Sequence, residues 1–243
     1  MLGAVAALVR RARLSLWAAG VRARLRRQGV RARFDIGREV RFHALPLVEL
    51  DATAPAARGG ALRVQIGDHV RLGRALTLDV RAGADNELVL GAGTIVQSWC
   101  RLQLHGGALI LGEHVHVRDN VQCKTKSRLT VGDRVVLSRD VIVHATAGVS
   151  IGSDCGIGER TSLIDSDHRL DGSGAAYLEA PLRAEPIELG SGVAVGANCV
   201  LLRGARLGDG CALAAGSVLH RGDVPAGHLA AGAPATVVKD LRG

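Results

Sequence analysis

The residue of this sequence best suited to proton transfer is His168, which ends the segment Asp165-Ser166-Asp167-His168. An imidazole commonly titrates near pH 6.5, so it can take a proton from a hydroxyl group that is otherwise a poor nucleophile. Asp165 and Asp167 could orient this ring or bind an acceptor molecule. A solvated loop histidine among polar neighbours is the structural alternative, and the residues alone do not decide between the two.

These residues interrupt a six-residue repeat in which each unit begins with an aliphatic residue, often followed by glycine. A period of six matches neither an α-helix nor a simple alternating strand. It suits a short strand and a turn, repeated so that one residue per unit points inward. Three such units make one coil of a triangular prism, and coils stack by parallel pairing. The clearest runs are LGEHVH-VRDNVQ from Leu111, VGDRVV-LSRDVI from Val131, IGSDCG-IGERTS from Ile151, and five consecutive units from Leu189.

The pattern predicts an all-β solenoid of about seven to eight coils. We expect a basic helical arm over residues 1–33, the solenoid over 34–224 with an excursion loop at 169–186, and a C-terminal tail over 225–243. Three of the five cysteines, Cys155, Cys199 and Cys211, fill the small fifth position of the repeat. They are therefore predicted to be reduced packing residues, and not disulfides or zinc ligands.

The repeat, the histidine loop and the closing segment LAAGSVLHRGDVPAGHLAAGAPATVVK resemble the hexapeptide-repeat acyltransferases. More narrowly, they resemble the maltose and galactoside O-acetyltransferase branch and related sugar or polysaccharide acetyltransferases. The resemblance covers about residues 60–240. It implies a left-handed parallel β-helix, a homotrimer, and acetyl-CoA bound in clefts between neighbouring prisms. It also implies that His168 is the catalytic base.

The resemblance also suggests which residues bind the two substrates. On the acceptor side it points to Ser138, with Asp140, Asp165 and Asp167 as further hydrogen-bonding candidates, although a solvated strand edge explains Ser138 and Asp140 equally well. On the cofactor side, the positions that correspond to acyl-CoA contacts in the family are Ala197, Ala215, Gly216, His220, Arg221 and, among the charged residues near the end, Lys239.

The sequence departs from the family pattern at two places. Relatives carry Trp where this chain has Ala194, and a proline close after the histidine where this chain has Arg169 and Leu170. The identity of the acyl group and of the acceptor therefore stays open. No His-x4-His spacing occurs, so the zinc-binding carbonic-anhydrase branch of the same fold is disfavoured and no metal is expected.

The positive charge is confined to the N-terminal arm. The net charge is +8, and residues 1–33 contain nine arginines and no acidic residue, so the remaining 210 residues sum to about −1. Leu2, Val5, Val9, Ala12 and Leu16 form one helical stripe. The arm could cap the open end of the solenoid, lie on anionic lipid, or do both. Nucleic acid is disfavoured, because Trp17 is the one aromatic residue of the arm.

We therefore expect an acetyl-CoA-dependent O-acetyltransferase that acts on a sugar or glycan intermediate. Two alternatives stay open: an N-acyltransferase acting on an amino-sugar nucleotide, and a non-catalytic β-helix scaffold. The sequence contains no continuous run of about eighteen apolar residues, the length that is needed to span a bilayer. No secretory signal peptide is evident. A cytoplasmic location, with possible contact at the inner face of the membrane, is expected.

Overall fold

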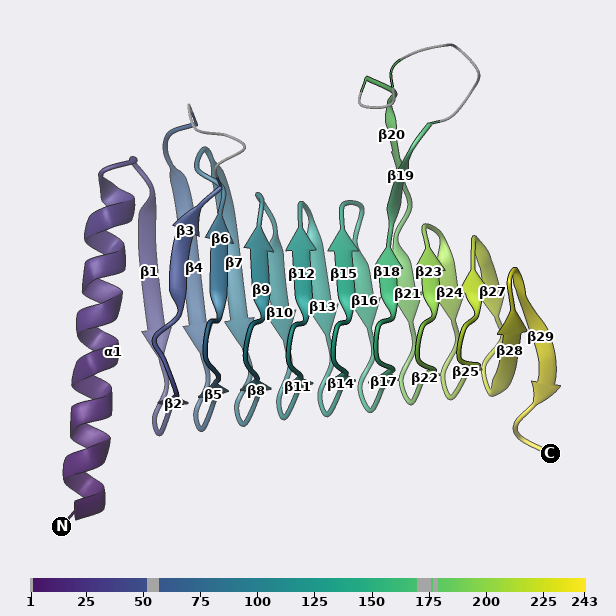
Figure 1. Cartoon of the computed structure of the whole chain (residues 1–243), viewed down its shortest axis with the longest axis horizontal. Coiled ribbons are helices and arrows are strands. Elements are labelled where there is room, and N and C mark those ends of the chain that lie inside the picture. Colours follow the sequence, from purple (N-terminus) through teal and green to yellow (C-terminus); the bar gives the residue numbers. More distant parts are fainter. Residues whose placement is uncertain (1, 52–56, 170–175, 177–178) are drawn as a thin grey trace.

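The chain folds as a three-sided parallel β-helix with one N-terminal helix, in a computed structural model that describes residues 2–51, 57–169, 176 and 179–243 (Figure 1). Successive strands pass from sheet A to sheet B to sheet C and then into the next coil. The eight strands of sheet C mark eight complete coils. The predicted left-handed β-helix is confirmed, at the upper end of the expected number of coils.

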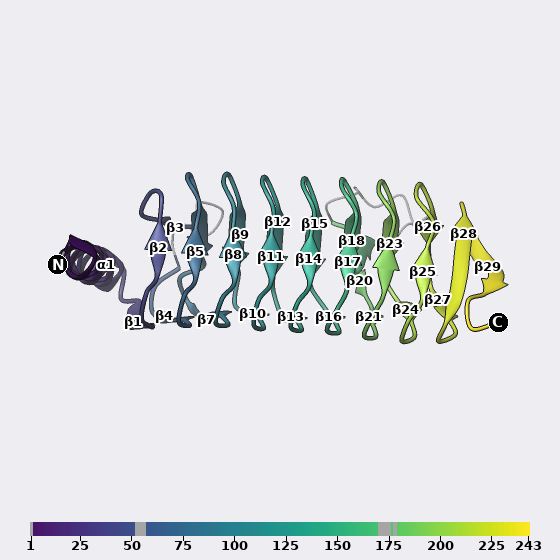
Figure 2. The ribbon, with the colours of Figure 1, turned by 90° about the horizontal axis from the view of Figure 1, so that it is seen from below.

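The strands of each face stack in parallel along the long axis of the molecule (Figure 2). Sheet A contains β1 (Arg31–Ile36), β4 (Gly60–Ile66), β7 (Ala84–Leu90), β10 (Ala108–Leu111), β13 (Arg128–Val131), β16 (Val149–Ile151), β21 (Ile187–Leu189), β24 (Ala205–Leu207) and β27 (Gly222–Val224). Sheet B contains β2 (Arg41–Phe42), β5 (Arg71–Leu72), β8 (Ile95–Val96), β11 (His116–Val117), β14 (Val136–Leu137), β17 (Gly156–Ile157), β22 (Ala194–Val195), β25 (Ala212–Leu213), β28 (His228–Gly232) and, antiparallel at the end, β29 (Ala235–Asp240). Sheet C contains β3 (Leu47–Leu50), β6 (Thr77–Val80), β9 (Arg101–Leu104), β12 (Gln122–Thr125), β15 (Ile142–Ala145), β18 (Ser162–Ile164), β23 (Val200–Leu202) and β26 (Val218–Leu219).

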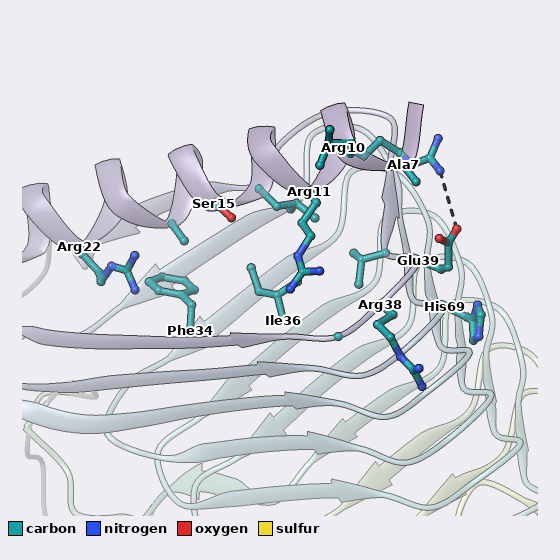
Figure 3. A pocket seen from close by; sticks show the side chains of 15 residues that line it. Ala7, Arg10, Arg11, Ser15, Arg22, Phe34, Ile36, Arg38, Glu39 and His69 are labelled. Carbon is teal, nitrogen blue, oxygen red and sulfur yellow. Dashed lines mark ion pairs between the residues drawn. The ribbon is translucent and has the colours of Figure 1, made fainter. Parts of the chain in front are cut away.

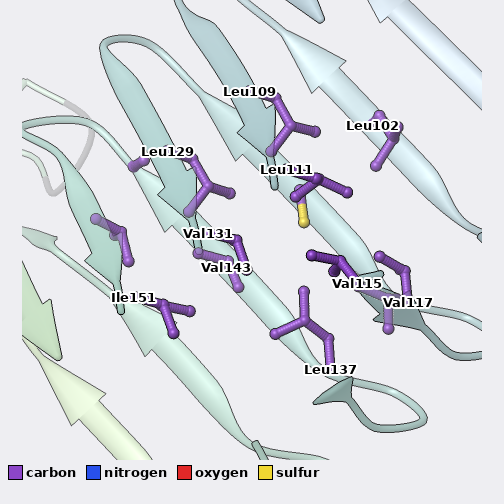
Figure 4. Packing of buried hydrophobic residues seen from close by; sticks show 14 of the residues in the cluster. Leu102, Leu109, Leu111, Val115, Val117, Leu129, Val131, Leu137, Val143 and Ile151 are labelled. Carbon is purple, nitrogen blue, oxygen red and sulfur yellow. The ribbon is translucent and has the colours of Figure 1, made fainter. Parts of the chain in front are cut away.

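Like residues stack on like residues from coil to coil. Leu109 pairs with Leu129, and Leu129 with Val149, so the middle coils advance by twenty residues, as the sequence predicts. The buried faces hold branched aliphatic side chains in continuous columns (Figure 4). All five cysteines are free and buried in these columns. Burial raises the pKa of the Cys123 thiol to about 12, in keeping with the predicted packing role.

Helix α1 (Leu2–Arg26) covers the N-terminal end of the solenoid (Figure 1). The Trp17 Nε1–H donates to the Pro46 carbonyl at 2.9 Å, and the Trp17 ring packs edge-on against Phe34 with 5.2 Å between centroids. The Arg13 guanidinium lies 5.0 Å from the centre of the Phe42 ring. The helix continues past Gly20, and the first strand begins at Arg31, so the solenoid starts slightly earlier than residue 34.

Residues 225–243 continue the solenoid. Strand β28 pairs with β25 in sheet B, and β29 folds back on β28 as an antiparallel hairpin. This hairpin covers the exposed edge of the last coil, an edge that would otherwise invite pairing with another chain. The segment expected as a tail is therefore a structured C-terminal end.

Candidate functional site

The interruption in the repeat is a β-hairpin that projects from the prism. Strand β19 (Ser166–His168) leaves directly after β18 and pairs antiparallel with β20 (Leu182–Ala184), with His168 opposite Leu182 (Figure 1). The hairpin stands at the corner where each sheet-C strand turns into the next sheet-A strand, which we call corner CA. The sequence also predicts a flexible stretch at 172–176, because its residues are small; except for Ala176, this stretch falls outside the described residues.

His168 is half-buried at the base of this hairpin, and its ring orientation is fixed by the backbone. Its Nδ1 atom lies 2.9 Å from the carbonyl oxygen of Ala180. A carbonyl can only accept a hydrogen bond, so Nδ1 carries the proton in this contact. In the neutral ring, the basic lone pair then lies on Nε2. In this tautomer the ring accepts a further proton at Nε2.

The surroundings of the Asp165 side chain favour a structural role. Its side chain is fully buried and accepts hydrogen bonds from the backbone N–H groups of Thr146, Ala147 and Gly148 at 2.7–2.8 Å. These amides belong to the turn of the preceding coil at corner CA. A carboxylate held in this way has little capacity left for an acceptor molecule, so the geometry favours a role in anchoring the hairpin.

Asp167 belongs to a network of charged side chains that the sequence does not predict. Arg203 is 8 % exposed, and it donates to Asp167 at 2.9 Å and to Glu185 at 2.7 Å. Arg221 also pairs with Glu185, and this contact holds the pKa of the Glu185 carboxyl below its usual range. The network ties both strands of the hairpin to the two following coils. The repeat gave one signal, since Arg203 and Arg221 occupy equivalent positions eighteen residues apart.

His144 lies one coil before the hairpin on strand β15, paired in register with Ile164. Burial lowers its pKa below the ordinary value of 6.5, and the nearby Lys124 acts in the same direction. The ring is therefore neutral at pH 7. Its position beside corner CA makes His144 a candidate for contact with an acceptor.

A second group of candidates lies at the corner between sheets B and C, which we call corner BC. It is formed by Ser138, Asp140, Ala197, Ala215 and Gly216. Ala197 and Ala215 are stacked, and the Gly216 N–H donates to the Ala197 carbonyl at 2.8 Å. Within the described part of the chain, no hydrogen-bond acceptor takes the N–H of Ala197 or Ala215. Corner BC therefore offers backbone donors.

The acceptor candidates at corner BC differ from each other. The carboxylate of Asp140 accepts from the Asn120 side-chain amide at 2.6 Å. Ser138 is partly buried after β14, with its backbone N–H bonded to the Ile157 carbonyl. Neither lies on the hairpin that holds His168.

The two corners lie at opposite ends of the sheet-C strands. The Asn198 N–H donates to Glu159, so corner BC lies level with Glu159, six residues before Asp165. At ~3.3 Å per residue the separation is about 20 Å. The Gly196-Ala197 turn therefore lies one coil after Glu159 along the axis, at the other end of the sheet-C strands from the hairpin. His220 and Arg221 lie at corner CA, and Lys239 lies on β29 at the C-terminal end.

The described residues include no cluster of three or more His, Cys, Asp or Glu side chains that could hold a metal ion. A groove of about 390 Å³ adjoins corner CA and is lined by Glu185, Pro186, Gly204, Arg206, Arg221, Gly222 and Asp223. A larger one, of about 740 Å³, lies far from His168, between α1 and the first coil (Figure 3).

Comparison with known proteins agrees with this architecture. Residues 186–221 match the model of the hexapeptide repeat of succinyl-transferase. A probable acetyltransferase of Mycobacterium tuberculosis is 32% identical over 133 residues, which are 54% of this chain and 44% of that protein. A 2,3,4,5-tetrahydropyridine-2,6-dicarboxylate N-acetyltransferase of Halalkalibacterium halodurans is 31% identical over 132 residues, 50% of this chain and 55% of that protein. The chain thus spans about half the length of the curated relatives it matches.

Among solved structures, a hexapeptide-repeat acetyltransferase of Vibrio cholerae in complex with acetyl coenzyme A superposes with a TM-score of 0.50. It is 26% identical, over 54% of this chain and 70% of that chain. A solenoid of six-residue units with three parallel faces defines the class of protein. The chain has the left-handed β-helix fold, residues 186–221 carry a hexapeptide repeat, and the chain is similar to hexapeptide-repeat acetyltransferases.

Proposed function

We propose that this protein is an acetyl-CoA-dependent acetyltransferase that acetylates a hydroxyl group of a sugar or glycan. The observation that carries the proposal is the orientation of His168, whose Nδ1–H is engaged by the Ala180 carbonyl so that Nε2 is the basic atom. The names of the relatives support acetyl transfer, and the Vibrio cholerae structure supports acetyl-CoA as the donor.

In this mechanism the Nε2 atom of His168 takes the proton of the acceptor hydroxyl as its oxygen attacks the thioester carbonyl carbon. The N–H groups of Ala197 and Ala215 are candidates to stabilise the oxyanion or to bind the pantetheine arm. When the carbon–sulfur bond breaks, the imidazolium returns its proton to the departing thiolate. The thioester is already activated, so no covalent enzyme intermediate is required.

We further propose that the working site forms between two copies of the chain in a homotrimer. The separation of about 20 Å between corners CA and BC prevents one chain from completing the site. The outward face of sheet C, which joins the two corners, is apolar in its later coils. It presents the partly buried residues Ile142, Ile164, Val200, Leu202 and Val218. A neighbouring copy against this face would bring its own corner BC toward His168.

Acetyl transfer to an amine is the second candidate function. The Halalkalibacterium halodurans relative is named as an N-acetyltransferase, and the same base and donor suit an amino-sugar nucleotide. A cytoplasmic location belongs to the proposal, because five free thiols suit a reducing compartment.

The test is acetyl-CoA turnover by wild type, His168→Ala and the control His116→Gln, which changes an exposed histidine on sheet B. Acceptors should include neutral sugars, oligosaccharides and amino-sugar nucleotides. We expect His168→Ala to lower turnover by roughly 10²–10⁴-fold and to bind CoA as wild type does in calorimetry. Undiminished turnover by His168→Ala would exclude it as the base. Absence of CoA binding by the wild type would favour a scaffold, and preference for amines would favour N-acetylation.

A further inference from the structure

Helix α1 has two apolar faces on opposite sides. One face packs onto the first coil through Leu14, Ala18, Val21 and Leu25, all of them buried. The opposite face points to solvent and presents Val5, Leu8, Val9 and Leu16, with exposed fractions of 59%, 70%, 52% and 73%. The stripe recognised in the sequence is therefore not the capping face. The cap is complete without it, so its exposed apolar side chains need another explanation.

Arginines line both sides of the exposed stripe. At 3.6 residues per turn, Arg13 and Arg24 border the stripe on one side, and Arg11 and Arg22 lie on the other side, between the stripe and the packed face. Arg26 and Arg27 extend the positive charge at the end of the helix, and residues 1–33 contain no acidic side chain. An apolar stripe between two rows of arginine is typical of a helix that lies in the interface of an anionic membrane.

A groove lies between α1 and the first coil. Arg11 and Arg22 extend from the helix into it, beside Ile36 and Phe34 respectively (Figure 3). Among the described residues, neither arginine has an acidic partner, whereas Arg10 pairs with Glu39 at 3.8 Å. The groove thus combines uncompensated positive charge with an apolar floor, which suits a phosphate group attached to an acyl chain.

We propose that the outward face of α1 docks the protein onto a bilayer that contains anionic phospholipid. A second copy is a poorer occupant, because two such helices face to face would oppose their arginines. Nucleic acid is also a poorer occupant, because the stripe is aliphatic and Trp17 packs on Phe34. No helix of the described residues is long and apolar enough to cross a membrane, so α1 lies on the surface.

This docking fixes the height of the candidate site. Helix α1 covers one end of the solenoid (Figure 1). The hairpin with His168 leaves the coil that contains β16, and β16 is five strands beyond β1 in sheet A. At ~4.8 Å per strand, His168 stands about 24 Å above the first coil. An acceptor would therefore reach the site from solution or at the end of a chain extending from the membrane.

The experiment is co-sedimentation of the full-length protein with vesicles of phosphatidylcholine alone and of phosphatidylcholine with phosphatidylglycerol. We expect binding to the anionic vesicles, little binding to the neutral ones, and weakening by salt. Leu16→Asp should lower the partition coefficient at least tenfold, because the charge enters the apolar face. Arg11→Gln/Arg24→Gln should lower it by about fivefold for each arginine.

Matched controls lie elsewhere on the surface. Val238→Asp changes an exposed valine at the opposite end of the solenoid, and Arg74→Gln/Arg128→Gln removes two exposed arginines of its body. Both should bind like wild type, and circular dichroism should show the wild-type fold for every variant. Equal binding to neutral vesicles, or wild-type binding by Leu16→Asp, would overturn the proposal. A lower mass of the Leu16→Asp assembly than of the wild-type assembly in lipid-free solution would also overturn it, because the face would then contact a second copy. Binding of the wild-type protein to duplex DNA but not to vesicles would overturn it as well.

Discussion

Corners CA and BC are built from the same repeat and present opposite kinds of chemistry. Corner CA carries charged and titratable side chains, with His168 on its hairpin and Arg203 bridging Asp167 and Glu185. Corner BC carries polar side chains such as Asp140 in its middle coils, but at Ala197 and Ala215 it presents small residues and backbone, with Ala197 stacked below Ala215. Proton transfer requires a titratable side chain, whereas a groove for an extended thioester requires space and fixed N–H donors. Under the proposed mechanism, the base lies at one corner and the donor groove at the other.

Close packing explains why the turns at corner BC carry glycine and other small residues. A Cβ atom on Gly158 would lie 2.5 Å from the backbone nitrogen of Ala197, and one on Gly196 would lie 2.5 Å from that of Ala215. These glycines permit the close stacking of successive turns, whatever the chemistry of the groove. Corner CA is free of this limit at the hairpin, because the chain leaves the prism there.

Mixed trimers test this division of labour most severely. His168→Ala removes the base at corner CA, and Ala215→Trp should fill the groove at corner BC, so each homotrimer should lose at least a hundredfold in turnover. If the site joins corners of two copies, random co-assembly of equal amounts restores about one quarter of the sites, because one interface in four combines an intact base with an intact groove. Turnover of co-expressed, co-purified variants measures this.

The control is a mixture of the two variants purified separately and combined without exchange of subunits. It should stay inactive. If co-expressed variants also stay inactive although mass spectrometry shows mixed trimers, each chain completes its own site, and the contrast between the corners has no catalytic meaning.

The second prediction separates the two aspartates of corner CA. Asp165→Asn places an amide against three backbone N–H donors, and we expect it to lower the free energy of unfolding by about 3 kcal/mol or more. Asp167→Asn removes the charge of one ion pair with Arg203 at a half-exposed position, so its cost should be below about 1 kcal/mol. Urea denaturation of both variants measures the difference. Equal stabilities would show that Asp165 does not anchor the hairpin.

The sequence predicts the solenoid well and the site in part, for a physical reason. The six-residue period fixes which residues point inward, so the three-sided solenoid, the advance of twenty residues from Leu111 to Val131 and the burial of three of the cysteines follow from the repeat. It does not reveal which face of α1 packs, because both stripes of the helix are apolar and only the shape of the first coil selects Leu14 and Leu25. The period also predicts the position of a residue along the solenoid axis more readily than the corner of the prism at which that residue lies.

The long-range contacts of the site were harder to foresee. Arg203 and Glu185 meet only because the hairpin returns to corner CA, and no local pattern encodes that path. The carboxylate of Asp165 was interpreted as a possible acceptor ligand because polarity is visible in the sequence, whereas three backbone amides around it are not.

The smallest effect concerns pH and the early coils of corner CA. His105 is buried there, with Nε2 3.6 Å from a carboxylate oxygen of Asp51. Burial is the largest influence and lowers the His105 pKa below 6.5; Asp51 opposes it, while Arg81 and Lys124 reinforce it. The unfolded chain therefore binds more protons than the folded chain just below pH 6.5, and stability falls as the pH drops through this range.

The measurement is the melting temperature at pH 7.5 and pH 5.5 for wild type, His105→Gln and the exposed-site control His116→Gln. Wild type and the control should lose a few degrees more on acidification than His105→Gln, which has no proton to gain. This part of the acid sensitivity would belong to corner CA, where His105 lies directly after β9. An identical loss in His105→Gln and wild type would mean that other groups carry the pH dependence, and that the two corners differ in catalysis but not in their response to acid.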